Sequence, residues 1–191
     1  MNARPDRKTR PEAPSVLTTA RLRDIALQYL GRQASSEANL RRVLARRLAR
    51  AARGGAVEPA EARARIDDVI AGLSRSGLLD DRAFAEGRAA SLRRRGFSAH
   101  GIRARLRAQG VDRDLIEAAL AAHDRPVPLA ELAAALAYAR RRRLGPYRAK
   151  LRRQYRDKDL ASLSRAGFPY DIARRIVEAA TAEELEGEVG G

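Results

Sequence analysis

The chain has 191 residues, of which 45% are hydrophobic, but 39 are alanine and none is tryptophan or cysteine. Few aromatic and β-branched residues are available for strands, which disfavours an all-β fold, and the lack of cysteine excludes disulfides and thiolate metal sites. Thirty-nine lysines and arginines against 24 acids give a net charge of +15, so we expect a polyanion or an acidic protein surface as the partner.

The first predicted segments are a tail and a set of three helices. Residues 1–17 are charged, contain prolines and have no apolar period, which predicts a disordered basic tail. Residues 18–77 form the first helical set, in which Thr19 is a candidate N-cap and Pro59 suits the first turn of the third helix. Its apolar stripes follow helical spacing: Leu22, Ile25, Ala26, Tyr29 and Leu30, then Leu40, Val43, Leu44 and Leu48, then Ile66, Val69, Ile70 and Leu73.

Residues 78–124 repeat this pattern as a second helical set. Asp80 or Asp81 is placed to cap its first helix, Ser98 opens the second, and Asp112 caps the third. The residues expected to face inward are Phe84, Ala85, Leu92, Ile102, Leu106, Leu115, Ile116, Ala119 and Leu120.

Residues 125–181 are predicted to form a third helical set. It consists of a helix from about Leu129 to Leu144, a basic helix running toward Ala166, and a last helix opened by Pro169. The final residues, 182–191, are rich in glutamate and are predicted to form a disordered acidic tail.

The three sets are related as repeats. Registering the second set on the third places Leu106 on Leu163 and Gly110 on Gly167, so apolar residues match apolar residues and glycine matches glycine. A three-helix unit of this size has a thin core, so neighbouring units are expected to stack. The predicted fold class is therefore all-α, an elongated tandem array of three three-helix repeats.

No catalytic, metal-binding or cofactor-binding constellation stands out. His100 and His123 are the only histidines, and neither has the spacing of a metal ligand, so both are interpreted as incidental surface residues. The adjacent acids Asp67 and Asp68, and the pair at Asp80, suggest either a metal site or helix caps. Capping is favoured because neighbouring residues on a helix point apart. We expect no enzyme, no metal and no cofactor.

A membrane location is also not expected. The longest uncharged helical stretch, Leu132–Ala139, is far shorter than the roughly 20 residues that a membrane-spanning helix needs. The basic N-terminal residues are not followed by the apolar segment of a secretory signal. The simplest expectation is a cytoplasmic protein.

The positive charge is clustered. Residues 41–53 contain arginines and no acid, residues 78–110 hold eight arginines and three acids, and residues 138–158 hold ten basic residues and one acid. Such clusters neutralise phosphates or acidic protein surfaces, although a solvated helical face is the alternative interpretation. The tyrosines within the last cluster, such as Tyr138 and Tyr155, either stack on bases or pack their rings into the core, and helical placement favours packing.

Three segments of the second set are distinctive: Leu78–Ala85 (LLDDRAFA), Arg93–Gly96 (RRRG), and Ile102–Leu106 (IRARL) followed by Gly110 and Val111. With them, the chain resembles the RecX family of bacterial recombination regulators. The flanking segments Ala26–Leu30 and Gly167–Ala173 resemble the outer repeats of the same family, so the resemblance covers residues from about 18 to 180.

The resemblance implies a protein that binds the RecA recombinase, in the helical groove of its filament on single-stranded DNA. It implies negative regulation of recombination, DNA repair and the SOS response through lower ATP hydrolysis, filament extension and strand exchange. We also expect a monomer with weak, non-specific DNA binding as a secondary property. The expected partner- or DNA-binding residues are Arg93, Arg94, Arg95, Arg103, Arg107, Arg140, Arg141, Arg142, Arg143, Arg152 and Arg153.

The main alternative is a helix-turn-helix transcription regulator, because three-helix units also describe that class. A protein that reads bases should concentrate polar residues on one recognition helix. Here Asn39 and Gln109 are isolated, and the basic residues are spread over all three sets, which favours the first hypothesis.

Overall fold

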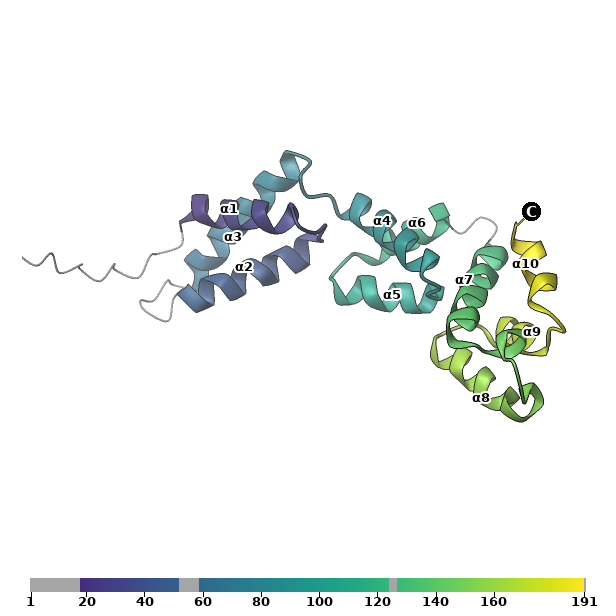
Figure 1. Ribbon diagram of the computed structural model, residues 1–191. Coiled ribbons are helices and arrows are strands. Elements are labelled where there is room, and N and C mark those ends of the chain that lie inside the picture. Colours follow the sequence, from purple (N-terminus) through teal and green to yellow (C-terminus); the bar gives the residue numbers. More distant parts are fainter. Residues whose placement is uncertain (1–17, 52–58, 124–126, 191) are drawn as a thin grey trace, which may run out of the picture. The chain divides into compact units, whose positions relative to one another are not determined.

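The computed structural model describes residues 18–51, 59–123 and 127–190, and over these residues the secondary structure is helical, without strands (Figure 1). The chain divides into two compact units. The first unit holds the described residues up to Ala34 together with Asn39–Leu79, and the second holds Ser35–Ala38 and the residues from Asp80 onward. The all-α prediction is confirmed. The tail predicted over residues 1–17 lies outside the described residues.

The first helical set consists of helices α1 (Thr19–Leu30), α2 (Glu37–Ala51) and α3 (Pro59–Arg75). The N-cap of α1 is Thr18, whose hydroxyl accepts a hydrogen bond from the Arg21 amide at 3.3 Å, one residue before the predicted cap. The predicted stripes meet in one hydrophobic core, whose most buried members are Leu22, Ala26, Leu40, Leu44, Ile70 and Leu73.

The second helical set begins the second unit with α4 (Asp81–Arg94), α5 (Ala99–Ala108) and α6 (Arg113–His123). Asp80 caps α4 by accepting from two backbone amides at 2.8 and 3.0 Å, and Ser98 caps α5 by accepting from the amide of the third helical residue at 3.0 Å. Small and branched residues fill its core: Ala85, Ala89, Leu92, Ile102, Leu106, Val111, Ile116, Ala119 and Leu120.

The third helical set follows with α7 (Val127–Arg142), a short 3₁₀ helix (Gly145–Tyr147), α8 (Arg152–Arg165), α9 (Tyr170–Glu178) and α10 (Ala182–Gly190). Its core is the largest of the three, and alanine contributes many of its buried positions: Ala134, Ala135, Ala139 and Ala173. These small side chains let the helix backbones approach closely, so the set is compact despite its few aromatic residues.

Helix α10 corrects one prediction. The sequence predicts a disordered acidic tail over residues 182–191, but the structure has a helix there, lying beside α7 (Figure 1). Leu185 is buried in the core of the third set and Val189 packs against it, so an apolar face docks the helix while its glutamates stay exposed. A short segment with only two large apolar residues gives a weak periodic signal, which is why its composition was misleading.

The second and third helical sets are packed together within the second unit. Gly96 has φ +72°, and a Cβ on it would lie 2.8 Å from the Tyr138 backbone nitrogen, so only glycine fits against α7. The Ser98 hydroxyl donates to the Ala166 carbonyl at 2.6 Å. One side chain therefore caps α5 and also holds the end of α8.

Candidate partner-binding surface

The arginines expected to bind a partner fall into two groups, those engaged inside the protein and those available on its surface. Arg93 belongs to the first group. Its side chain is 10% exposed, and its Nη1 lies 2.6 Å from Oε2 of Glu131 and 3.1 Å from the Phe97 carbonyl oxygen. The structure therefore places the Arg93 charge inside the protein, neutralised by a carboxylate, and not on a surface.

Glu131 explains why Arg93 is buried. This carboxylate on α7 is itself buried and also accepts a hydrogen bond from the Ala99 amide, at 3.1 Å to Oε2. The Glu131 carboxylate therefore neutralises the Arg93 charge at the end of α4 and also accepts a hydrogen bond from the Ala99 amide at the start of α5. The buried ion pair connects the second and third helical sets.

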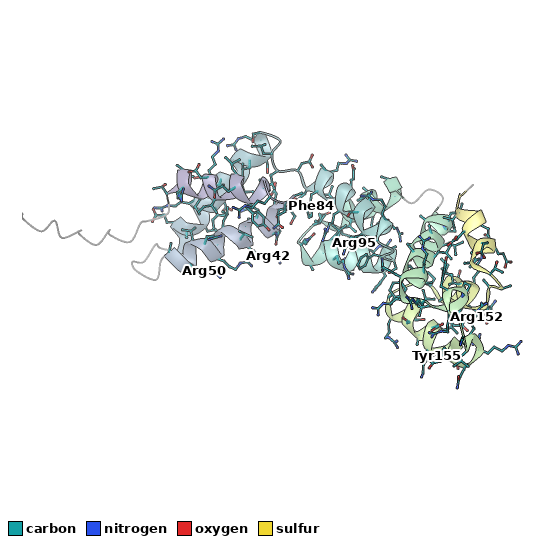
Figure 2. All side chains as sticks on the ribbon, in the orientation of Figure 1. Arg42, Arg50, Phe84, Arg95, Arg152 and Tyr155 are labelled. Atoms are coloured by element: carbon teal, nitrogen blue, oxygen red, sulfur yellow. The ribbon has the colours of Figure 1, made fainter. Side chains whose placement is uncertain are left out.

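Arg103 and Arg152 are also engaged, although both reach the surface. Arg103 makes a two-pronged contact with Glu117, with both N···O distances at 2.8 Å, and this hydrogen bonding lowers the pKa of the Glu117 carboxyl. Arg152, at the start of α8 (Figure 2), donates to the carbonyls of Ala179 and Ala180 and so caps the C-terminal end of α9. Arg140 is exposed and lies 3.9 Å from Glu186 of α10.

The remaining expected residues form the available group. They are exposed and form no ion pair with a carboxylate in the part of the chain that the structure describes, although Arg141 donates a hydrogen bond to the Arg95 carbonyl. Arg95, at the end of α4 (Figure 2), lies 5.6 Å from the centroid of the Phe97 ring. The seven members, which we call the free arginines, are Arg94, Arg95, Arg107, Arg141, Arg142, Arg143 and Arg153.

Two of the free arginines line a hollow that the sequence did not indicate. It has a volume of about 720 Å³ and is lined by residues of α5, α7 and α8 and by the turn before α5. Arg141 and Arg142 meet there with Arg105 and Arg165, two arginines that were not among the expected site residues. Helical spacing offered only a weak signal, since Arg105 lies in the same basic run as Arg103 but on another face of α5.

The tyrosines of the basic cluster support the fold. Tyr138 is half-buried and its ring centroid lies 5.7 Å from that of Phe168 in the core. Tyr155 lies on α8 (Figure 2), and the guanidinium carbon of Arg148 is 4.3 Å from the centroid of the Tyr155 ring. Arg148 in turn pairs with the buried Asp159 at 2.7 Å. Both rings are therefore engaged within the third helical set.

The first unit carries its own exposed basic side chains. Arg42 and Arg50 project from α2 (Figure 2) and are exposed. Arg41 on α2 forms an ion pair with Asp67 on α3, so the Asp67 carboxylate links these two helices.

The described residues include no group of three histidine, cysteine or acidic side chains that could hold a metal ion. The same residues contain no helix with both the length and the hydrophobicity to span a bilayer. His100 is exposed and lines the hollow between α5 and α8, while the side chain of His123 lies outside the described part.

Comparisons with known proteins agree with this architecture. Residues 80–120 match the family model described as "RecX, second three-helix domain". The crystal structure of RecX from Lactobacillus salivarius has a TM-score of 0.57 at 19% identity, covering 90% of this chain and 96% of that one. A second crystal structure of regulatory protein RecX has a TM-score of 0.62 at 20% identity, covering 84% and 73%. These two likenesses concern the fold.

Sequence relatives extend over almost the whole chain. The regulatory protein RecX of Myxococcus xanthus (strain DK1622) is 38% identical over 178 residues, covering 91% of this chain and 94% of the relative. The regulatory protein RecX of Agrobacterium fabrum (strain C58 / ATCC 33970) is 30% identical over 180 residues, covering 92% and 93%. The resemblance found in the sequence is confirmed, and the chain belongs to the RecX family of regulatory proteins.

Proposed function

We propose that this protein is a negative regulator of homologous recombination and DNA repair that binds the RecA recombinase in the groove of its filament on single-stranded DNA. It inhibits ATP hydrolysis, filament extension and strand exchange. It acts as a monomer in the cytoplasm and has a weak, non-specific affinity for free DNA. Membership of a family of regulatory proteins supports the regulatory part of this proposal.

One observation carries the rest, namely the seven free arginines of the second and third helical sets. An arginine that is exposed and has no carboxylate partner retains its charge for an outside anion. Several such residues on consecutive helical sets offer many modest contacts, whose combined effect can be strong attachment along a filament. Occupying a groove requires binding and no chemistry.

The structure reduces the set of arginines that we propose as contact residues. Arg93, Arg103 and Arg152 contribute their hydrogen bonds to other parts of the same protein. We therefore propose the free arginines, and not these three, as the residues that face the acidic filament surface or DNA phosphates. Arg140 remains a partial candidate because its distance to Glu186 is long for an ion pair, at 3.9 Å.

The proposal is tested with the cognate recombinase on single-stranded DNA. The purified protein should slow DNA-dependent ATP hydrolysis at substoichiometric amounts. The variant Arg94→Glu/Arg107→Glu should raise the concentration for half-inhibition at least about tenfold, while Arg94→Lys/Arg107→Lys, which keeps the charge, should stay within about threefold. No inhibition by the wild-type protein across a concentration series would overturn the proposal. Tight, salt-resistant binding to one duplex sequence in a gel shift would favour the helix-turn-helix alternative.

A further inference from the structure

The hollow between α5, α7 and α8 has the size and charge of a ligand site. Its volume of about 720 Å³ lies within the range of roughly 300–1,000 Å³ found for small-molecule sites. Four arginines line it, and no lining residue is acidic. We call this site the arginine pocket, made by Arg105, Arg141, Arg142 and Arg165 with Phe97 and Tyr138.

Three of the four arginines of this pocket are held in place by aromatic rings or backbone oxygens, and one of these contacts is the hydrogen bond that Arg141 donates to the Arg95 carbonyl. The guanidinium of Arg105 lies 4.0 Å from the centroid of Phe97 and donates one hydrogen bond to the Gly101 carbonyl at 3.0 Å. Those of Arg141 and Arg142 lie 5.9 and 5.8 Å from the centroid of Tyr138. An arginine has five N–H donors, so most donors remain available after these contacts. Positions fixed before binding reduce the entropy lost when an anion arrives.

The helix terminus beside the pocket does not supply the anion site. The first amides of α5 are already used, since Ala99 donates to Glu131 and Gly101 donates to the Ser98 hydroxyl at 3.0 Å. The arginine side chains are therefore the charged groups available to hold an anion in this pocket. Substitution of those side chains tests the site directly.

The residue types favour a nucleotide over an acidic peptide. Guanidinium groups bind phosphates through two parallel hydrogen bonds, and four uncompensated cations in one hollow match a ligand with several negative charges. Guanidinium planes and aromatic rings also provide surfaces on which a base can stack. A carboxylate side chain could use the same donors, but it brings no ring to these surfaces.

We propose that the arginine pocket binds the phosphate groups of nucleotides. This chemistry is shared by a segment of single-stranded nucleic acid and by a free nucleoside triphosphate. The inference rests on the weak DNA affinity within the proposed function and gives that affinity a defined site. It does not require the recombinase.

The test measures binding of a fluorescein-labelled short thymidine oligonucleotide to the full chain by fluorescence anisotropy, without recombinase. The pocket variant is Arg142→Gln/Arg165→Gln, and the matched control is Arg63→Gln/Arg75→Gln, at two exposed arginines of α3 outside the proposed contact surface. Both remove two charges from exposed arginines. The pocket variant should weaken binding at least about tenfold, while the control should weaken it less than about threefold. In a salt series the slope of log K against log salt should become shallower by about 1.4 in the pocket variant, because each lost phosphate contact to a single strand removes about 0.7.

Competition identifies the source of the phosphate. Displacement of the oligonucleotide by ATP in the wild-type protein, but not by a polyglutamate peptide of equal charge, supports a site that also accepts free nucleotides. No displacement by either competitor supports a site for a nucleic acid strand. Stronger displacement by polyglutamate, or an equal loss in the pocket and control variants, would overturn the inference.

The inference and the proposed function can fail separately. Wild-type protein that inhibits the recombinase ATPase but binds neither the oligonucleotide nor ATP would overturn the pocket and leave the proposed function intact. Wild-type protein that binds the oligonucleotide through the pocket but never inhibits the ATPase would overturn the proposed function alone.

Discussion

The substitution Glu131→Gln tests whether one buried ion pair holds the second and third helical sets together. The side chains of Arg93 and Glu131 are 10% and 9% exposed, and the carboxylate also accepts from the Ala99 amide. Glutamine keeps the shape but leaves the guanidinium without its counter-charge. Loss of one partner of a buried pair costs about 3–5 kcal/mol, and because glutamine still offers one acceptor we expect about 3 kcal/mol.

The assay must separate the two compact units, since their unfolding is not expected to be one two-state transition. Hydrogen exchange followed by mass spectrometry does this peptide by peptide. Peptides from α5 and α7 should exchange about a hundredfold faster in Glu131→Gln, because 1.4 kcal/mol corresponds to a factor of ten. Peptides from α1 serve as the internal control and should keep their exchange rates.

A compensating variant checks the cause. Replacing both charges with apolar residues, in Arg93→Met/Glu131→Leu, should recover most of the stability because no uncompensated charge remains buried. The unsatisfied Ala99 amide should prevent full recovery. A loss below about 1 kcal/mol in Glu131→Gln, or a double variant less stable than the single one, would refute the assignment of Arg93 to a buried ion pair.

Three further predictions concern other parts of the second unit. Gly96→Ala should lower the free energy of unfolding by about 3 kcal/mol, because its Cβ would lie 2.8 Å from a backbone nitrogen of α7. Gly87 on α4 faces open space, so Gly87→Ala should raise the free energy of unfolding by about 0.5–1 kcal/mol, and thermal unfolding measures both changes. The Glu117 carboxyl should titrate below its ordinary pKa of 4.5 in carbon-detected NMR, so its stabilising effect is present above that pH and is lost as the pH falls through the lowered pKa. Burial and the hydrogen bond to Glu186 raise the pKa of Tyr147 to about 12, so its stabilising effect is lost as the pH rises through that value, and Glu186→Gln should lower the pKa in an absorbance titration. If the Tyr147 pKa were the same in Glu186→Gln as in the wild-type protein, the result would contradict the contact between Tyr147 and α10.

The sequence predicted those features that depend on neighbours along the chain. Asp80 and Ser98 cap the helices they were expected to cap, because a short polar side chain satisfies nearby amides wherever the fold places it. Glycines at the ends of α4 and α5, Gly96 and Gly110, have positive φ, a conformation that glycine adopts at little cost. Alanine, arginine and leucine are strong helix formers, so the all-α class was also accessible.

Features that depend on distant partners were not accessible. Arg93 and Arg94 are adjacent in one basic run, yet the first is buried against a glutamate 38 positions away and the second is exposed. Nothing in the run distinguishes them. The arginine pocket was missed for the same reason, since Arg105 and Arg165 come together only when α5 packs near α8.

This distinction changes what the net charge of +15 means. Buried or paired acids such as Glu131, Glu117 and Asp159 each neutralise an arginine that the composition counts as available. A substitution that removes one of those arginines should act first on stability, whereas removal of a free arginine is expected to have little effect on stability and to lower the affinity for the proposed anion. Loss of regulation in an arginine variant is therefore evidence for a contact only where the free energy of unfolding is unchanged.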